Sequence, residues 1–153
     1  MKKIFLFLAV VFISIQAGAQ TDQAKSVRST QTFGDYTVHF TVFNSTFITP
    51  EIARAYALTR GNNQVLINIS VTKTSGGKTS LGLPAKITGT ATNLIQQQQV
   101  LDFKTISEGE ATYYLASLRH THEEAINFSV DVQPEGVAKP FVVKFTRTLH
   151  VEK

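Results

Sequence analysis

Apolar and polar residues alternate with a period of two along much of the chain after Phe33. The alternation is regular in four segments, residues 36–42, 65–72, 126–133 and 141–146. A period of two places the apolar side chains on one face of an extended segment, so each segment predicts a half-buried β-strand. Residues 20–31 are polar and lack this period, which predicts a loose N-terminal arm.

Three less regular segments are further strand candidates, at residues 85–94, 98–106 and 111–118. Turn residues such as glycine and asparagine separate the candidates, and we interpret Gln96–Gln99 as a solvated connection. About seven strands without helical crossovers predict an all-β fold with one domain over residues 32–153. An immunoglobulin-like antiparallel β-sandwich is the leading expectation, and a small barrel is the alternative.

One segment predicts a short helix between the first two strands, closing one end of the sandwich. Thr49 can cap the helix, Pro50 suits its first position, and Glu51 places an acid in its first turn. Ile52 and Tyr56 are four residues apart and share a face of such a helix.

The first residues have the pattern of an export signal. Lys2 and Lys3 precede an apolar run over residues 4–15, and Ala17-Gly18-Ala19 has the small-x-small form that signal peptidase cleaves. The run is too short to span a membrane. We therefore predict a signal peptide over residues 1–19, cleaved after Ala19, a periplasmic location and no transmembrane segment in the mature chain.

Composition and charge exclude several classes of function. The chain has no cysteine, so disulfides, thiolate nucleophiles and iron–sulfur clusters are excluded. The Lys and Arg residues, 15 against 11 Asp and Glu, are scattered rather than grouped, so we expect no nucleic-acid partner. No serine stands in a recognisable nucleophile motif. Glu108 and Glu110 form a carboxylate pair in a predicted turn, which leaves an envelope hydrolase as the weakest alternative.

The histidines raise the possibility of a metal site. His120 and His122 are two residues apart, and in an extended segment both imidazoles would point the same way. They are candidate copper or zinc ligands, although a closed site usually has four ligands. His39 and His150 lie on the predicted first and last strands and are possible neighbours. A solvated polar turn is the simpler interpretation, so we expect no cofactor.

The segment from Phe43 to Arg60 is unusual because aromatic residues interrupt its polar positions. We favour the interpretation that Phe43 and Phe47 plug the end of the sandwich under the helix. The alternative is a partner or ligand surface with the following members: Asn44, Ser45, Phe47, Tyr56 and Arg60.

Several short blocks also resemble one family, the small exported proteins of Gram-negative bacteria catalogued as domain of unknown function 4426. The blocks that carry the resemblance are Phe33–Tyr36, Val38–His39, Phe43–Phe47 and Pro50–Glu51. The resemblance covers about residues 31–152 and implies a periplasmic location and one small domain. It brings no catalytic residues. We therefore expect a non-enzymatic binding module with an envelope protein or component as its partner, and a metal-binding protein as the alternative.

Overall fold

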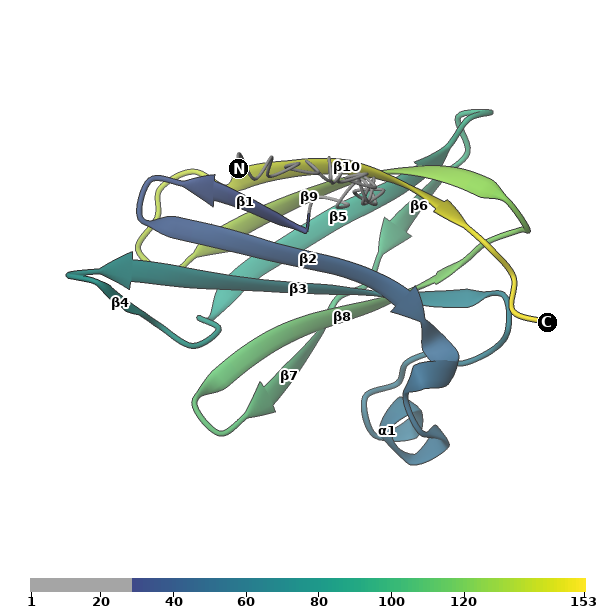
Figure 1. Cartoon of the computed structure of the whole chain (residues 1–153), viewed down its shortest axis with the longest axis horizontal. Helices are drawn as coiled ribbons and strands as arrows, with labels where there is room; N and C mark the ends of the chain where they lie inside the picture. Colours follow the sequence, from purple (N-terminus) through teal and green to yellow (C-terminus); the bar gives the residue numbers. More distant parts are fainter. Residues whose placement is uncertain (1–28) are drawn as a thin grey trace, which may run out of the picture.

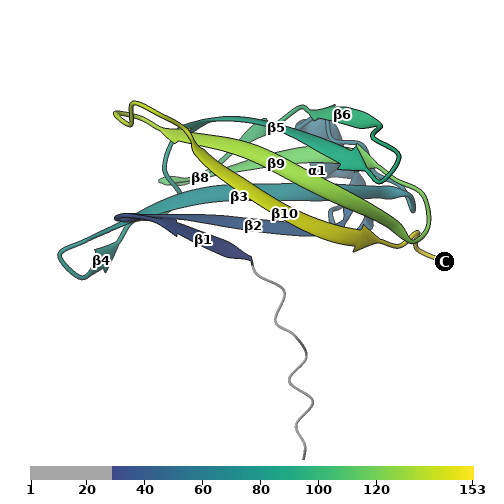
Figure 2. The same ribbon diagram turned by 90° about the horizontal axis from the view of Figure 1, so that it is seen from above.

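The computed structural model describes residues 29–153 as two antiparallel β-sheets packed face to face (Figures 1 and 2). The first sheet has the strand order β1 (Thr30–Phe33), β2 (Tyr36–Asn44), β3 (Gln64–Ser75), β8 (Ala111–Arg119) and β7 (Lys104–Glu108), with β4 (Lys78–Thr79) also paired to β3. The second sheet has the strand order β10 (Phe141–Leu149), β9 (Glu124–Pro134), β5 (Ala85–Asn93) and β6 (Gln98–Leu101).

This strand order is that of an immunoglobulin-like sandwich. Strands β2-β3-β8-β7 correspond to the order A-B-E-D, and β10-β9-β5-β6 correspond to G-F-C with an added C′ strand. The predicted fold class is therefore confirmed, and the two separate sheets correspond to the sandwich rather than the barrel. The described residues form ten strands rather than about seven.

The difference in strand number has a local cause. The predicted strand over residues 98–106 is two strands, β6 and β7, which belong to different sheets. Leu101 faces the core between the sheets, whereas Ile106 is buried outside that core. A single strand with one buried face therefore does not describe this segment. The connection predicted over Gln96–Gln99 is also shorter than expected, because Gln98 and Gln99 belong to β6 and the turn comes before them.

The core lies between the sheets and consists of the inward side chains of the alternating strands. The Phe145 ring stacks on Phe40 of the opposite sheet at a centroid distance of 4.5 Å and on Phe128 at 4.8 Å. Burial of one such side chain stabilises a fold by about 1.5–3 kcal/mol. The regular alternation thus identified the face of each main strand that the sandwich buries.

The N-terminal boundary differs from the expectation. Thr30 and Gln31, predicted to end a loose arm, belong to β1, which pairs with β2 through a turn at Gly34 (φ 58°). The Phe33 ring stacks on Phe141 of the second sheet at 4.7 Å and attaches this strand to the sandwich. The predicted signal peptide and residues 20–28 of the arm lie outside the described residues. Within residues 29–153, none of the helices has the length and apolar character needed to cross a membrane.

The predicted helix is present between β2 and β3, after a short 3₁₀ helix, η1 (Ser45–Phe47). Helix α1 (Pro50–Ala55) begins after Thr49, whose hydroxyl accepts a hydrogen bond from the Ile52 N–H at 3.3 Å. The side chain that it buries is Ala53, while Ile52 is exposed and Tyr56 half-buried. The predicted Ile52–Tyr56 face is therefore not the buried one.

Candidate functional site

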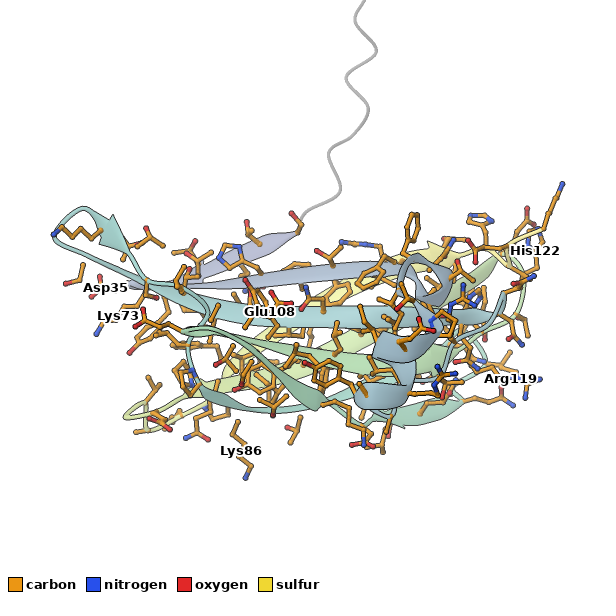
Figure 3. The ribbon with its side chains drawn as sticks, turned by 90° about the horizontal axis from the view of Figure 1, so that it is seen from below. Asp35, Lys73, Lys86, Glu108, Arg119 and His122 are labelled. Carbon is orange, nitrogen blue, oxygen red and sulfur yellow. The ribbon has the colours of Figure 1, made fainter. Side chains whose placement is uncertain are left out.

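Several connections gather at one end of the sandwich, which we call the loop end (Figure 1). Strands β2, β5, β8 and β10 finish there, and β3, β6 and β9 begin there. The loop end therefore holds η1 and α1, the β5–β6 hairpin, the β8–β9 turn and the C-terminal segment after Leu149. Figure 3 shows His122 and Arg119 at this end and Asp35 and Lys73 at the other.

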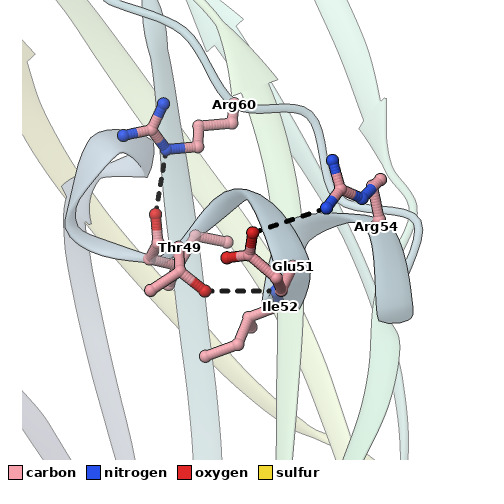
Figure 4. A network of polar contacts seen from close by, with 6 residues as sticks. Thr49, Glu51, Ile52, Arg54 and Arg60 are labelled. Atoms are coloured by element: carbon pink, nitrogen blue, oxygen red, sulfur yellow. Dashed lines mark hydrogen bonds and ion pairs between the residues drawn. The ribbon is translucent and has the colours of Figure 1, made fainter.

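The segment from η1 to the start of β3 is fixed by polar contacts to its own backbone. Ser45 is 0% exposed, and its hydroxyl donates to the Gly61 carbonyl at 3.0 Å and accepts from the Gly61 N–H at 2.9 Å. The Arg60 guanidinium donates to the carbonyl of Ile48 at 2.9 Å (Figure 4). Ser45 is thus unavailable to a partner, which corrects its predicted role as a surface contact.

The same segment is attached to the outer face of the first sheet. The Thr59 N–H donates to the Ser117 hydroxyl at 2.9 Å, and Ser117 is the cross-strand neighbour of Leu66. Leu66 points away from the core between the sheets but is fully buried. The residues after α1 are therefore attached to the outer face of the first sheet next to Leu66.

Phe47 lies on the surface of the loop end, where it is 77% exposed. The interpretation that it plugs the end of the sandwich is therefore wrong, whereas Phe43 is half-buried. Asn44 and Tyr56 are also half-buried, and Asn44 precedes η1 without a side-chain capping bond. Among the five residues of the predicted surface, Phe47 is therefore the apolar residue that is exposed to solvent.

The β5–β6 hairpin presents two large apolar side chains that the sequence analysis did not single out. Leu94 is 71% exposed and Ile95 is 74% exposed. The Asn93 carboxamide oxygen accepts from the Gln97 N–H at 2.9 Å, and the Asn93 N–H donates to the Gln97 carbonyl at 3.1 Å. The tip is thus a hydrogen-bonded turn in which Leu94 and Ile95 face solvent.

The β8–β9 turn is linked to this hairpin through Glu124. The Glu124 carboxylate accepts from the Thr121 N–H at 2.7 Å, from the Thr121 hydroxyl at 3.1 Å and from the Asn93 side-chain amide at 3.0 Å. The backbone bond from Thr121 is the largest of the interactions that lower the pKa of Glu124, and partial burial opposes it. Glu124 is therefore a charged link between two connections of the loop end.

His120 and His122 do not form the common ligand pair that their spacing suggested. His120 is 4% exposed, its Nδ1–H donates to the Thr121 carbonyl at 2.8 Å, and its Nε2 has no partner. His122 is exposed on the turn. Strand β8 ends at Arg119, so the alternation that would align the two rings no longer applies.

His122 instead lies beside Glu123 and His150. Each of these three exposed residues offers one ligand atom, and the three atoms lie within 4.8 Å of one another. The rings of His122 and His150 meet edge to face at a centroid distance of 5.6 Å. His39 is not part of this group; its Nε2 lies 3.0 Å from the Thr72 hydroxyl on the neighbouring strand.

A recess of about 220 Å³ opens on the outer face of the first sheet, away from the core. Its lining residues are Phe43, Asn68, Ile106, Glu108, Tyr113 and Leu115. The Asn68 side-chain oxygen is buried there without a hydrogen-bond partner. Glu108 lines the recess but Glu110 does not, so the recess lacks the carboxylate pair on which the hydrolase alternative depends.

Comparison with known proteins places this architecture in a family. A family model described as a domain of unknown function, DUF4426, matches residues 30–152. The crystal structure of a DUF4426 family protein from Pseudomonas aeruginosa PAO1 has 31% identity, covers 81% of this chain and 95% of its own, and has a TM-score of 0.71. No curated protein matches the chain.

FetP of uropathogenic Escherichia coli strain F11 is similar in fold alone. FetP, recombinantly expressed in the periplasm of E. coli, has 13% identity over 83% of this chain and 96% of its own, with a TM-score of 0.62. A copper-bound variant of FetP has 14% identity over 82% and 97%, with a TM-score of 0.62. From the family match and the Pseudomonas structure, the chain belongs to the DUF4426 family, whose function is unknown.

Proposed function

We propose that this protein is a non-enzymatic binding module of the cell envelope that holds another protein at its loop end. The observation that carries the proposal is the exposure of Leu94 and Ile95 side by side at the tip of the β5–β6 hairpin. Hairpin tips normally carry polar or glycine residues, because their side chains remain in water. Two adjacent large apolar side chains at such a tip favour a contact with a partner.

The rigidity of the loop end supports this proposal. Asn93 closes the hairpin tip with bonds to Gln97, and its side-chain amide also donates to Glu124 of the next turn. A surface that is ordered before binding loses less conformational entropy on association. Phe47 adds an exposed aromatic ring on a segment fixed by Ser45, and aromatic residues are frequent anchors of interfaces.

The chemistry of the loop end supports binding rather than catalysis. The hydroxyl of Ser45 and the guanidinium of Arg60 are engaged with backbone groups of their own segment. The carboxylate of Glu124 is likewise engaged with Thr121 and Asn93. These three polar groups organise the connections, whereas the side chains of Phe47, Leu94 and Ile95 are exposed and available to a partner.

The envelope location rests on the first residues of the chain. Lys2 and Lys3, the apolar run and Ala17-Gly18-Ala19 have the order of an export signal. FetP, which is similar in fold, was recombinantly expressed in the periplasm of E. coli. A partner in the same compartment would meet the mature chain after cleavage.

Photo-crosslinking in living cells tests the proposal. A photoreactive amino acid is placed at Ile95 or Phe47, or at Leu81 as the control, which is exposed in the connection between β4 and β5. We expect the same crosslinked protein from Ile95 and Phe47, no such product from Leu81, and loss of the Phe47 product when Ile95→Ser is added. No product from the loop end, or equal products from Leu81, would refute the proposal.

A further inference from the structure

The group formed by His122, Glu123 and His150 has a chemistry that the proposed binding surface does not use. We propose that these three side chains bind one divalent copper or zinc ion. Two imidazoles and one carboxylate are the ligand types that these ions take in proteins, whereas magnesium and calcium prefer oxygen ligands alone. The site is separate from Leu94 and Ile95, and its existence does not depend on a protein partner.

The distances fit a site that closes around an ion. The ligand atoms lie within 4.8 Å of one another. An ion bonded to nitrogen or oxygen at about 2.1 Å needs ligand atoms about 3.4 Å apart in a tetrahedral arrangement. The contraction needed is at most about 1.4 Å, and the three side chains can supply it by small torsional changes because all three are exposed.

The backbone brings Glu123 toward His122. Glu123 has φ 54°, a left-handed conformation that is uncommon and costly for a residue with a side chain. Its carboxylate lies 3.9 Å from the Nε2 of His122, the residue just before it. Adjacent residues of a strand would point to opposite faces, so the turn conformation is what places both side chains at one point.

The C-terminal segment holds His150 at the same place. Leu149, the last residue of β10, is buried and pairs with Glu124 at the start of β9. The Val151 N–H donates to the Nδ1 of His122 at 3.3 Å, and the Glu152 N–H donates to the Asn62 carbonyl at 3.0 Å. The residues on both sides of His150 are therefore fixed, and the two histidines are held together without an ion.

The Val151 N–H donates to the Nδ1 of His122, so this nitrogen acts as an acceptor. A ring nitrogen that binds a metal uses the same lone pair. The ion can take Nδ1 by displacing the long bond from Val151. It can instead take Nε2, beside Glu123, when the ring proton is on Nδ1. Either route uses the same three residues.

Three protein ligands leave one position of a tetrahedral site open. Structural zinc sites usually have four protein ligands, whereas sites with three keep a water or an external ligand in the fourth position. The proposed ion is also exposed to solvent, so we expect an exchangeable ion. An ion that binds the folded chain and not the unfolded one raises the melting temperature. The bound ion would link the β8–β9 turn to the C-terminal segment.

Titration of the full chain with ZnCl₂ or CuSO₄ alone, without a histidine tag, tests the site. Isothermal titration calorimetry measures the stoichiometry and affinity, and thermal unfolding measures the stabilisation. We expect one ion per chain and a melting temperature several degrees higher with the ion. His122→Gln and His150→Gln should each weaken binding tenfold or more, and Glu123→Gln should weaken it several-fold.

His39→Gln is the matched control, because it removes an imidazole from β2, which is not part of the proposed site. Glu123→Gln guards against a folding defect, because its side chain is exposed and carries no packing. Absence of binding, unchanged affinity in both His122→Gln and His150→Gln, or an equal loss in His39→Gln would overturn the proposal. If the crosslink from Ile95 persists in His150→Gln, the proposed protein contact does not depend on the metal site, and each proposal can fail without the other.

Discussion

Replacement of Ser45 by alanine tests how the loop end is held in place. The hydroxyl makes two hydrogen bonds with Gly61, one to its carbonyl at 3.0 Å and one from its N–H at 2.9 Å. The Gly61 carbonyl keeps a second partner, the Gln64 N–H at 3.1 Å, but the N–H of the half-buried Gly61 loses its acceptor beside the fully buried Ser45. A donor that loses its acceptor where water does not replace it costs about 1–3 kcal/mol, and the second lost bond costs about 0.5–1.5 kcal/mol. We therefore expect Ser45→Ala to lower the free energy of unfolding by about 2–3 kcal/mol.

Urea denaturation measures this loss directly. With a slope of about 1–3 kcal/mol/M for a domain of this size, the midpoint should fall by about 0.7–3 M. Ser129→Ala, on the outer face of β9, is the control and should change stability by less than about 0.5 kcal/mol. Hydrogen exchange should increase first over residues 45–61, the segment that the bond pair closes. A loss below about 0.5 kcal/mol in Ser45→Ala would refute the reasoning, because it would mean that water satisfies the Gly61 N–H.

Three further changes test other parts of the structure. Gly82→Ala would place a Cβ against the Thr112 carbonyl oxygen and disturb the 2.9 Å bond from the Thr112 N–H to the Gly82 carbonyl, so we expect a loss of about 2 kcal/mol in urea denaturation. Tyr114→Phe removes the hydroxyl that accepts from the Ala85 N–H at 2.7 Å and should cost about 1–2 kcal/mol, measured by thermal unfolding; an unchanged melting temperature would contradict this. The pKa of Glu124 is lowered in the folded chain, so its stabilisation is present above the ordinary value of about 4.5 and is lost as pH falls through the folded value. Urea denaturation of Glu124→Gln from pH 3 to 7 should therefore show a stability difference from the wild type that shrinks toward low pH.

The fold was predictable from the sequence where one face of a strand is buried. In β9, for example, Ile126, Phe128 and Val130 are buried and alternate with more polar neighbours, so the period identifies both the strand and its inner face. The rule fails at residues 98–106, because Leu101 and Ile106 are buried in different apolar contacts. It also fails at β1, whose attachment depends on the stacking of Phe33 on Phe141, far away in the sequence.

The candidate sites were less predictable, because they depend on contacts between distant segments. The sequence drew attention to His122 but paired it with His120, its near neighbour in the chain. The structure instead brings His150 to it, through the pairing of β10 with β9 and the bond from Val151. Leu94 was missed because it was assigned to the end of a strand, and its exposure depends on the turn that Asn93 closes.

The two proposals share the loop end but depend on different chemistry. The protein contact depends on apolar area at Leu94 and Ile95, whereas the metal site depends on lone pairs at His122 and His150. Glu124 connects them, because it accepts from Asn93 on the hairpin and from Thr121 on the turn. This carboxylate holds both connections in one arrangement before an ion or a protein binds, so each site is ordered in advance and loses less conformational entropy on binding.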